Sequence, residues 1–176
     1  MESILSARTR FVRRQESSLR SFNGAVQVAL LTPDLPYMGT IIEDSDVSVQ
    51  DDPFRCLEKY MAAYAMGVTH APYIPGSDIT DFQLSLMNNT DLTVVVMCRP
   101  IRMGDDEAVG SLNDQTRFMD SVARMSEGRK LCCVQYNTLE YGIDAMFSNV
   151  ICSKTYEEHD LRSTAELLLG SVKVRL

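Results

Sequence analysis

The sequence predicts a single α+β domain over residues 24–176, preceded by a basic, flexible arm over residues 1–23. Strand-type and helix-type stretches alternate along the chain, and one pair of strands has the pattern of a hairpin. Apolar residues make up 45% of the chain and charged residues 23%, which is enough apolar material for a sizeable core. Because a hairpin is antiparallel, we expect a mixed or antiparallel sheet with about three helices rather than a doubly wound parallel sheet.

The arm differs in charge from the rest of the chain. The first 24 residues carry five arginines against two glutamates, a net charge of +3, whereas the other 152 carry 12 basic and 22 acidic residues, a net charge of −10. Guanidinium groups suit planar contacts with phosphates, and an acidic body offers complementary charge to the arm of a second copy. We therefore expect five residues to contact a partner subunit or a polyanion: Arg8, Arg10, Arg13, Arg14 and Arg20.

The first strand of the domain is expected at AVQVALL (residues 25–31), and it ends at the proline-containing stretch TPDLPYMG. Short strands at TII and DVSVQ flank an acidic stretch. The clearest helix is DDPFRCLEKYMAAYAMG (residues 51–67), in which Asp51 or Asp52 caps the start, Pro53 suits the first turn and Gly67 suits the end. The next residues, HAPYIPGS, are expected to break regular structure.

The predicted hairpin covers residues 79–98, ITDFQLSLMNNTDLTVVVMC. Its first half alternates apolar Phe82, Leu84 and Leu86 with polar residues, which indicates a strand with one wet face. NNTD supplies the turn, and the apolar run LTVVVMC suits a central strand. The polar, glycine-bearing stretch RPIRMGDDEAVG (residues 99–110) is expected to be an exposed loop.

Two helices and three strands are expected in the rest of the chain. A helix over residues 113–128 begins at Asn113 or Asp114, and KLCCVQY and AMFSNVICS have the composition of strands. The last helix covers residues 155–170, with the capping-box spacing of Thr155 and Glu158 and an end at Gly170. VKVRL then suits an edge strand. No internal repeat or interdomain linker is evident.

The sequence lacks the common motifs for cofactors and metals. There is no glycine-rich phosphate loop, and His70 and His159 have no paired-ligand spacing. The acidic cluster lacks the glycine and terminal glutamate of a calcium loop, and is better explained as a solvated loop: Glu43, Asp44, Asp46, Asp51 and Asp52. We therefore expect no cofactor, no metal and no small-molecule substrate.

Five cysteines without a framework spacing indicate a reducing compartment. The start of the chain has no run of signal-peptide character, and no stretch reaches the length of a membrane span. These features predict an intracellular, cytoplasmic protein. One enzymatic alternative stays open, in which Cys98 paired with His70, or Cys133, acts as a nucleophile; buried cysteines and an exposed loop histidine explain the same residues.

The order of the predicted elements begins with a basic N-terminal segment, the strand GAVQVALL and the helix PFRCLEKYMAAYAMG, and continues with proline and glycine loops, antiparallel strands and a late helix. This order resembles that of the small matrix proteins of negative-strand RNA viruses, especially those of plant rhabdoviruses. The chain lacks the P-P-x-Y motif of the animal-virus relatives and is acidic where they tend to be basic. The resemblance implies a non-enzymatic protein that self-associates, condenses nucleocapsid and contacts membrane, with the arm as the contact segment.

The leading hypothesis is thus an intracellular assembly protein that forms homo-oligomers and contacts a polyanion, either RNA in a nucleocapsid or an anionic membrane. The second hypothesis is a regulatory or adaptor module that binds other proteins through PDLP, PYIP or the acidic cluster. The third is the small cysteine-dependent enzyme.

Overall fold

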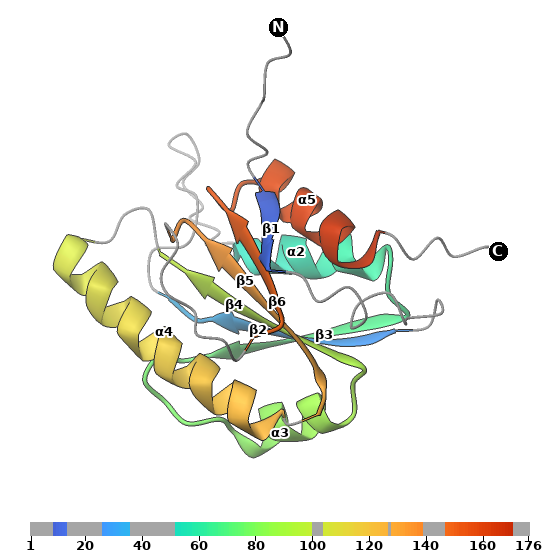
Figure 1. Cartoon of the computed structure of the whole chain (residues 1–176), viewed down its shortest axis with the longest axis horizontal. Helices are drawn as coiled ribbons and strands as arrows, with labels where there is room; N and C mark the ends of the chain where they lie inside the picture. Colours follow the sequence, from blue (N-terminus) through green and yellow to red (C-terminus); the bar gives the residue numbers. More distant parts are fainter. Residues whose placement is uncertain are drawn as a thin grey trace, which may run out of the picture.

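The computed structural model describes residues 9–13, 26–35, 52–99, 104–126, 128–138 and 147–170. These residues form a single α+β domain with a mixed sheet of six strands, as the sequence predicts, and four helices (Figure 1). The strands are β1 (Thr9–Arg13), β2 (Gln27–Pro33), β3 (Gly67–Tyr73), β4 (Leu92–Cys98), β5 (Lys130–Tyr136) and β6 (Asn149–Ser153). The helices are α2 (Pro53–Ala62), α3 (Asp81–Asn88), α4 (Asp105–Met125) and α5 (Glu158–Leu169).

The strands lie in the order β1-β6-β5-β4-β2-β3. Strands β2 to β6 are parallel to their neighbours, and only β1 runs antiparallel, beside β6. Helices α2 and α5 cover one face of the sheet, and α3 and α4 cover the other (Figure 1). The carboxyl ends of the five parallel strands therefore share one edge of the sheet, which is where α/β sheets present their loops.

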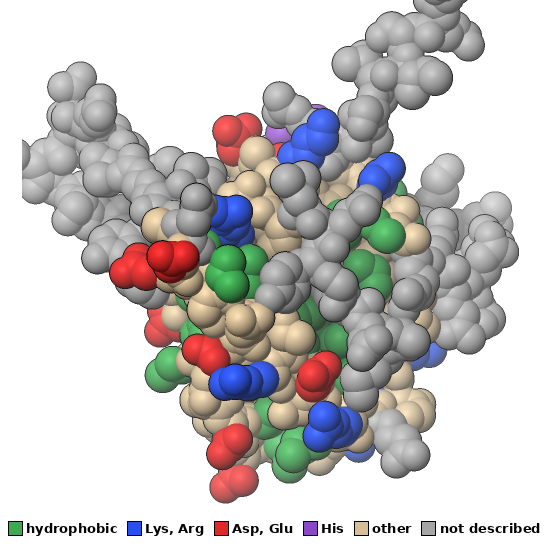
Figure 2. All heavy atoms as spheres, turned by 60° about the vertical axis from the view of Figure 1, so that its left-hand side comes forward, with side chains coloured by type: hydrophobic (Ala, Val, Ile, Leu, Met, Phe, Trp, Pro, Cys, Tyr) green, Lys and Arg blue, Asp and Glu red, His purple; other side chains and the backbone are tan. Residues whose placement is uncertain are grey.

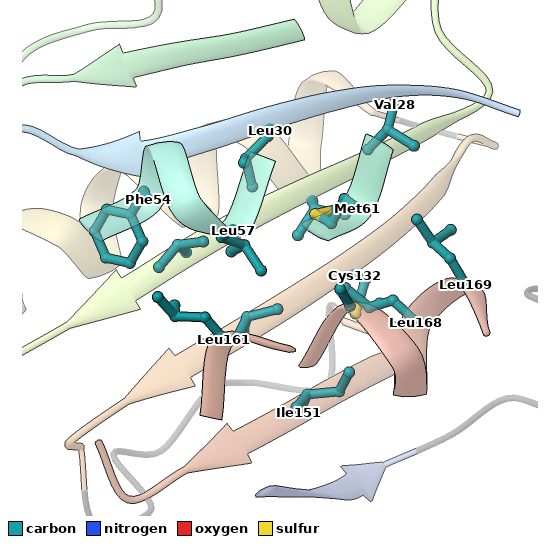
Figure 3. Close-up of a cluster of buried hydrophobic side chains, with 14 of the residues drawn as sticks. Val28, Leu30, Phe54, Leu57, Met61, Cys132, Ile151, Leu161, Leu168 and Leu169 are labelled. Atoms are coloured by element: carbon teal, nitrogen blue, oxygen red, sulfur yellow. The ribbon is translucent and has the colours of Figure 1, made fainter. Parts of the chain in front are cut away.

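Successive side chains of each strand point to opposite faces of the sheet, so the buried residues form two cores, one on each face. In β2, Val28 and Leu30 face α2 and α5, while Leu31 faces α3 and α4. On the first face, Phe54, Leu57 and Met61 of α2 and Leu161, Leu168 and Leu169 of α5 pack over the strands (Figure 3). The central strand β4 is buried along its whole length, as expected for a parallel strand with both faces covered.

Three helices are where the sequence predicts them, with shorter or longer bounds. Helix α2 begins after Asp52, whose Oδ1 accepts a 2.9 Å hydrogen bond from the backbone N–H of Phe54. It ends at Ala62, so Gly67 belongs to the next strand and does not terminate the helix. Helix α5 begins at Glu158 without the predicted capping box, because the Thr155 hydroxyl bonds the carboxylate of Asp160 instead.

The predicted hairpin is wrong in its first half, since residues 81–88 form helix α3. Thr80 and Gln83 make a complete capping box, in which each side chain accepts from the backbone N–H of the other. Two orphan N–H groups are satisfied in this way, which favours a helix over the alternating strand pattern. Strand β4 is accordingly parallel to both of its neighbours rather than half of a hairpin.

Two stretches predicted as loops are regular. Residues 67–73, including all of HAPY, form strand β3 beside β2, and its Pro72 is tolerated because β3 is an edge strand. Residues 105–110, predicted as an exposed loop, are the first turns of α4. The acidic residues Asp106 and Glu107 lie near the N-terminus of this helix, where the helix dipole favours negative charge.

Part of the predicted arm belongs to the sheet. Residues 9–13 form β1, so a flexible arm over residues 1–23 does not describe this stretch. Thr9 Oγ1 lies 2.8 Å from Ser153 Oγ and donates to Asp160 Oδ1 at 3.4 Å, which ties β1 to β6 and α5. The rest of the arm, the strands expected at TII and DVSVQ, and VKVRL all lie outside the described residues.

Candidate binding site at the carboxyl edge of the sheet

Strands β2 and β4 diverge at the carboxyl edge. If the parallel strands β2 to β6 are numbered 1 to 5 along the chain, they lie in the order 2-1-3-4-5. The connection after β2 therefore leads to β3 on one side of β2, and the connection after β3 leads to β4 on the other side of β2. In open α/β sheets, ligands bind outside the carboxyl ends of the strands at such a point of reversal. The residues that follow these two strands are Asp34, which is exposed, and Arg99, which is half-buried.

Pro33 ends the hydrogen bonding between β2 and β4. The register pairs these strands as far as Leu31 and Val95, and its continuation would have residue 33 donate to the carbonyl of Val96. Proline has no N–H to donate. The hydroxyl of Tyr73, at the end of β3, donates to this carbonyl instead at 2.8 Å.

Gln115 of α4 completes the same side of β4. Its Oε1 accepts from the backbone N–H of Cys98 at 2.8 Å, and its Nε2 donates to the Cys98 carbonyl at 2.9 Å and to Ser111 Oγ at 3.1 Å. The carboxamide therefore occupies the position of a neighbouring strand. Gln115 is fully buried, so these backbone groups would otherwise lack partners.

An aromatic stack packs beside the diverging ends of β2 and β4, on the face of the sheet that α3 and α4 cover. The rings of Tyr73 and Phe118 lie 3.9 Å apart between centroids at an angle of 5°. Burial raises the pKa of Tyr73 well above its usual value, which keeps its hydroxyl protonated as a donor. Because Tyr73, Phe118 and Gln115 close this side, a ligand at the reversal point would contact the outer rim, where Asp34 and Arg99 lie.

On the side of α2, the same edge carries a polar cluster centred on His70. Its Nε2 lies 2.6 Å from the hydroxyl oxygen of Thr32, near the end of β2. Its side chain is only 7% exposed, and two carboxylates of the α2 segment approach it. Asp52 Oδ2 lies 3.8 Å from Nε2, and Glu58 Oε2 lies 3.9 Å from Nδ1.

The pKa of His70 is lowered, chiefly because burial disfavours the charged ring; Asp52 and Glu58 oppose this effect and Arg55 adds to it. A neutral ring with its proton on Nδ1 directs that N–H toward Glu58 and accepts at Nε2 from Thr32. This arrangement resembles a base beside a hydroxyl, but Thr32 is only 1% exposed. The cluster therefore joins β2, β3 and α2 rather than presenting a nucleophile to solvent.

The structure does not bring Cys98 and His70 together as a catalytic pair. The polar partners of the His70 ring are Thr32 and the two carboxylates. Burial raises the pKa of Cys98 and of Cys133 well above that of a free thiol, so the reactive thiolate form is disfavoured at both positions. All five cysteines are free thiols, and Cys56 is the exposed one.

Two of the five predicted contact arginines lie in the described part of the chain. Arg10 and Arg13 belong to β1, at the edge of the sheet, and the Arg10 side chain is exposed. Arg8, Arg14 and Arg20 lie outside the described residues. On the face shown in Figure 2, acidic and basic side chains of the described residues are interspersed and gather into no block of one sign.

The described residues contain no group of three or more acidic, histidine or cysteine side chains that could hold a metal ion. Of the predicted acidic cluster, only Asp52 is described, and it caps α2. No helix within these described residues has the length and apolar character needed to cross a membrane.

No family model matches the chain, and no curated protein matches it by sequence. Its fold is similar to parts of several solved glycosidases. One is a fungal multi-domain β-N-acetylglucosaminidase of glycoside hydrolase family 3, described as containing a GCN5-related glucosamine N-acetyltransferase region, with a TM-score of 0.67 and 9% identity. Others are a family 3 β-N-acetylglucosaminidase from Paenibacillus sp. (TM-score 0.64, 14% identity) and a β-glucosidase from Listeria innocua solved with glucose (TM-score 0.62, 15% identity).

The superpositions use nearly all of this chain and a small part of each of those proteins. They cover 95% of this chain and 17% of the fungal enzyme, 95% and 29% for the Paenibacillus enzyme, and 93% and 24% for the Listeria enzyme. At these identities the similarity concerns the fold alone. The chain thus corresponds in fold to one portion of proteins several times its length.

Proposed function

We propose that this chain is a carbohydrate-binding domain that binds a sugar at the carboxyl edge of its sheet, where β2 and β4 diverge. The observation that carries the proposal is the strand reversal there, which places Asp34 and Arg99 at the ends of the two diverging strands. Carboxylate and guanidinium groups offer the acceptors and forked donors that sugar hydroxyls bind. The choice of ligand class rests on the solved glycosidases in which one portion has this fold.

In this proposal the domain binds without catalysing a reaction of its own. The raised pKa of Cys98 and Cys133 and the burial of Thr32 support binding over nucleophilic catalysis. The proposal adds a small-molecule ligand to the expectation of no small-molecule substrate, and keeps the expectation of no enzymatic activity as part of the proposal.

Calorimetric titration with glucose, laminaribiose and N-acetylglucosamine tests the sugar proposal. Asp34→Ala and Arg99→Ala should each weaken binding by about tenfold, the loss expected for a charge-assisted hydrogen bond. Glu166→Ala is the matched control, because Glu166 is an exposed acidic residue near the C-terminal end of α5, away from the carboxyl edge of the sheet. Absence of binding by the unmodified chain, or equal loss in the control variant, would contradict the proposal.

A second candidate is the assembly role, in which an intracellular chain self-associates and contacts RNA, nucleocapsid or anionic membrane through its arginines. The specific observation in its favour is the exposed Arg10 on edge strand β1 of an otherwise acidic protein. The free cysteines support the reducing compartment. Sedimentation across salt concentrations tests it: mass should fall as salt rises, because screening weakens arginine contacts, and a mass unaffected by salt or by Arg10→Gln would count against it.

A further inference from the structure

The two edges of the sheet differ in how they are protected. Strand β1 carries the exposed Arg10 and has a register irregularity between Phe11 and Arg13, and both features discourage pairing with another strand. Strand β3 has no charged side chain and no register irregularity, and it is protected only by Pro72 near its end. Residues 60–77 contain no aspartate, glutamate, lysine or arginine, although such residues make up 23% of the chain.

The backbone of β3 has hydrogen-bonding groups that face outward. Tyr73 O accepts from Asp34 N and Gly67 N donates to Val26 O, so the odd-numbered residues of β3 face β2. The backbone N–H and C=O groups of Val68 and His70, and the C=O group of Pro72, consequently point away from β2, out of the edge of the sheet. Pro72 has no N–H, and its carbonyl accepts from Gln83 Nε2 at 2.9 Å.

Val68 and His70 therefore form the open part of the edge. Within the described ranges, no backbone or side-chain group hydrogen-bonds their outward N–H and C=O groups. Exposed apolar side chains lie at both ends of the strand, with Met66 70% and Ile74 64% exposed. An uncharged strand with open backbone groups and apolar flanks is a template for pairing with another strand.

We propose that two copies of this chain pair through their β3 strands, antiparallel, around a two-fold axis at Thr69. In this register, Val68 of each copy lies opposite His70 of the other and exchanges both backbone hydrogen bonds with it. All the open donors and acceptors are then used, and the six-stranded sheets join into one. A two-fold axis makes the contact self-complementary and closed.

The same register matches the apolar flanks. Met66, directly before β3, then lies near Pro72 of the other copy, so apolar side chains meet beyond the hydrogen-bonded pairs. The exposed Thr69 meets its own copy on the axis, as a non-hydrogen-bonded pair, the type of antiparallel pair with the closer side chains. No like charges face each other along this part of the strand. This pairing uses β3 and not the arginines of β1, so it is independent of the assembly role described above.

Thr69 provides a direct test by sedimentation equilibrium of the full chain. Thr69→Lys and Thr69→Glu each place two like charges opposite one another on the axis, and each should raise the dimer dissociation constant by about fivefold or more. An equimolar mixture of the two variants should dimerise again, because every contact then joins opposite charges. Thr69→Val is the matched control and should remain dimeric, since it keeps the size and shape of the side chain.

Because Thr69 is exposed, these variants should keep the fold, which far-ultraviolet circular dichroism verifies. A monomeric unmodified chain at its highest soluble concentration would overturn the proposal. So would a dimer that both charged variants leave intact, or charged variants whose mixture stays monomeric. A dimer that dissociates with rising salt and with Arg10→Gln, but not with Thr69→Lys, would assign the contact to β1 instead.

Discussion

The hydroxyl of Tyr73 donates a 2.8 Å hydrogen bond to the backbone carbonyl of Val96, two strands away across β2. This bond replaces the one that Pro33 cannot make at the end of the ladder between β2 and β4. The point at which many α/β sheets open to a ligand is thus partly closed by a side chain of this protein itself.

Tyr73→Phe removes this bond while keeping the ring that stacks on Phe118. The Val96 carbonyl is then buried without a partner, so the free energy of unfolding should fall by about 1–3 kcal/mol. Urea unfolding monitored by circular dichroism measures the change. Tyr64→Phe is the control, expected to shift stability by less than about 0.5 kcal/mol, because Tyr64 is only partly buried. Equal losses in both variants would refute the role of the Tyr73 hydroxyl.

Gln115→Met keeps the volume of the side chain and removes both of its contacts with the backbone of Cys98. Two buried backbone groups lose their partners, so we expect a loss of roughly 2–5 kcal/mol in the free energy of unfolding. Native-state hydrogen exchange provides a local readout, because the Cys98 amide should lose protection more than the amides of β5. A variant as stable as the unmodified chain would show that water or a rearrangement satisfies these groups.

The lowered pKa of His70 makes stability depend on pH. The unfolded chain binds a proton on this ring near pH 6.5 and the folded chain does so only at lower pH, so the unfolded state holds more protons between the two values. The stabilisation from neutral His70 is present above about pH 6.5 and is lost as pH falls toward the folded pKa. His70→Gln should therefore lose less stability than the unmodified chain between about pH 8 and pH 5.

Urea unfolding midpoints across this pH range test the prediction, and NMR titration of the His70 ring gives its pKa directly. A stability difference that stays constant with pH, or a ring that titrates above the value of free histidine, would show that Asp52 and Glu58 outweigh the effect of burial.

Thiol labelling distinguishes exposed from buried cysteines. Cys56 should react with a thiol reagent in the folded protein, whereas Cys98, Cys132 and Cys133 should react only after unfolding, because burial raises their pKa and limits access. The rate for each residue can be followed by mass spectrometry of proteolytic peptides. Fast labelling of Cys98 or Cys133 in the native protein at neutral pH would contradict this prediction and support the hypothesis of a cysteine-dependent enzyme.

Much of the fold follows from local patterns in the sequence. The apolar runs of β4 and β5 and the cap at Asp52 lead to the correct strands and to the start of α2. Helix α3 could also be predicted from the sequence, because Thr80 and Gln83 have the spacing of a capping box. The alternation of Phe82, Leu84 and Leu86 suggested a strand, and the local capping signal was the better guide.

The remaining features depend on partners that are distant in sequence. Strand β1 is recognisable only beside Ser153 and Asp160, more than 140 residues away. His70 stands in a stretch with loop-like composition, and its role emerges from Thr32 on the neighbouring strand. Pro33 signals the end of a strand, but nothing local indicates that Tyr73 and Gln115 fill the space beyond it.

The most direct test of the proposed sugar site is a titration of the isotopically labelled chain with glucose and N-acetylglucosamine, followed by amide chemical shifts. The proposal predicts saturable shifts confined to residues at the carboxyl ends of the strands, centred on Asp34 and Arg99, with Glu166 unaffected. Saturable shifts centred elsewhere, or no shifts at saturating sugar, would contradict it.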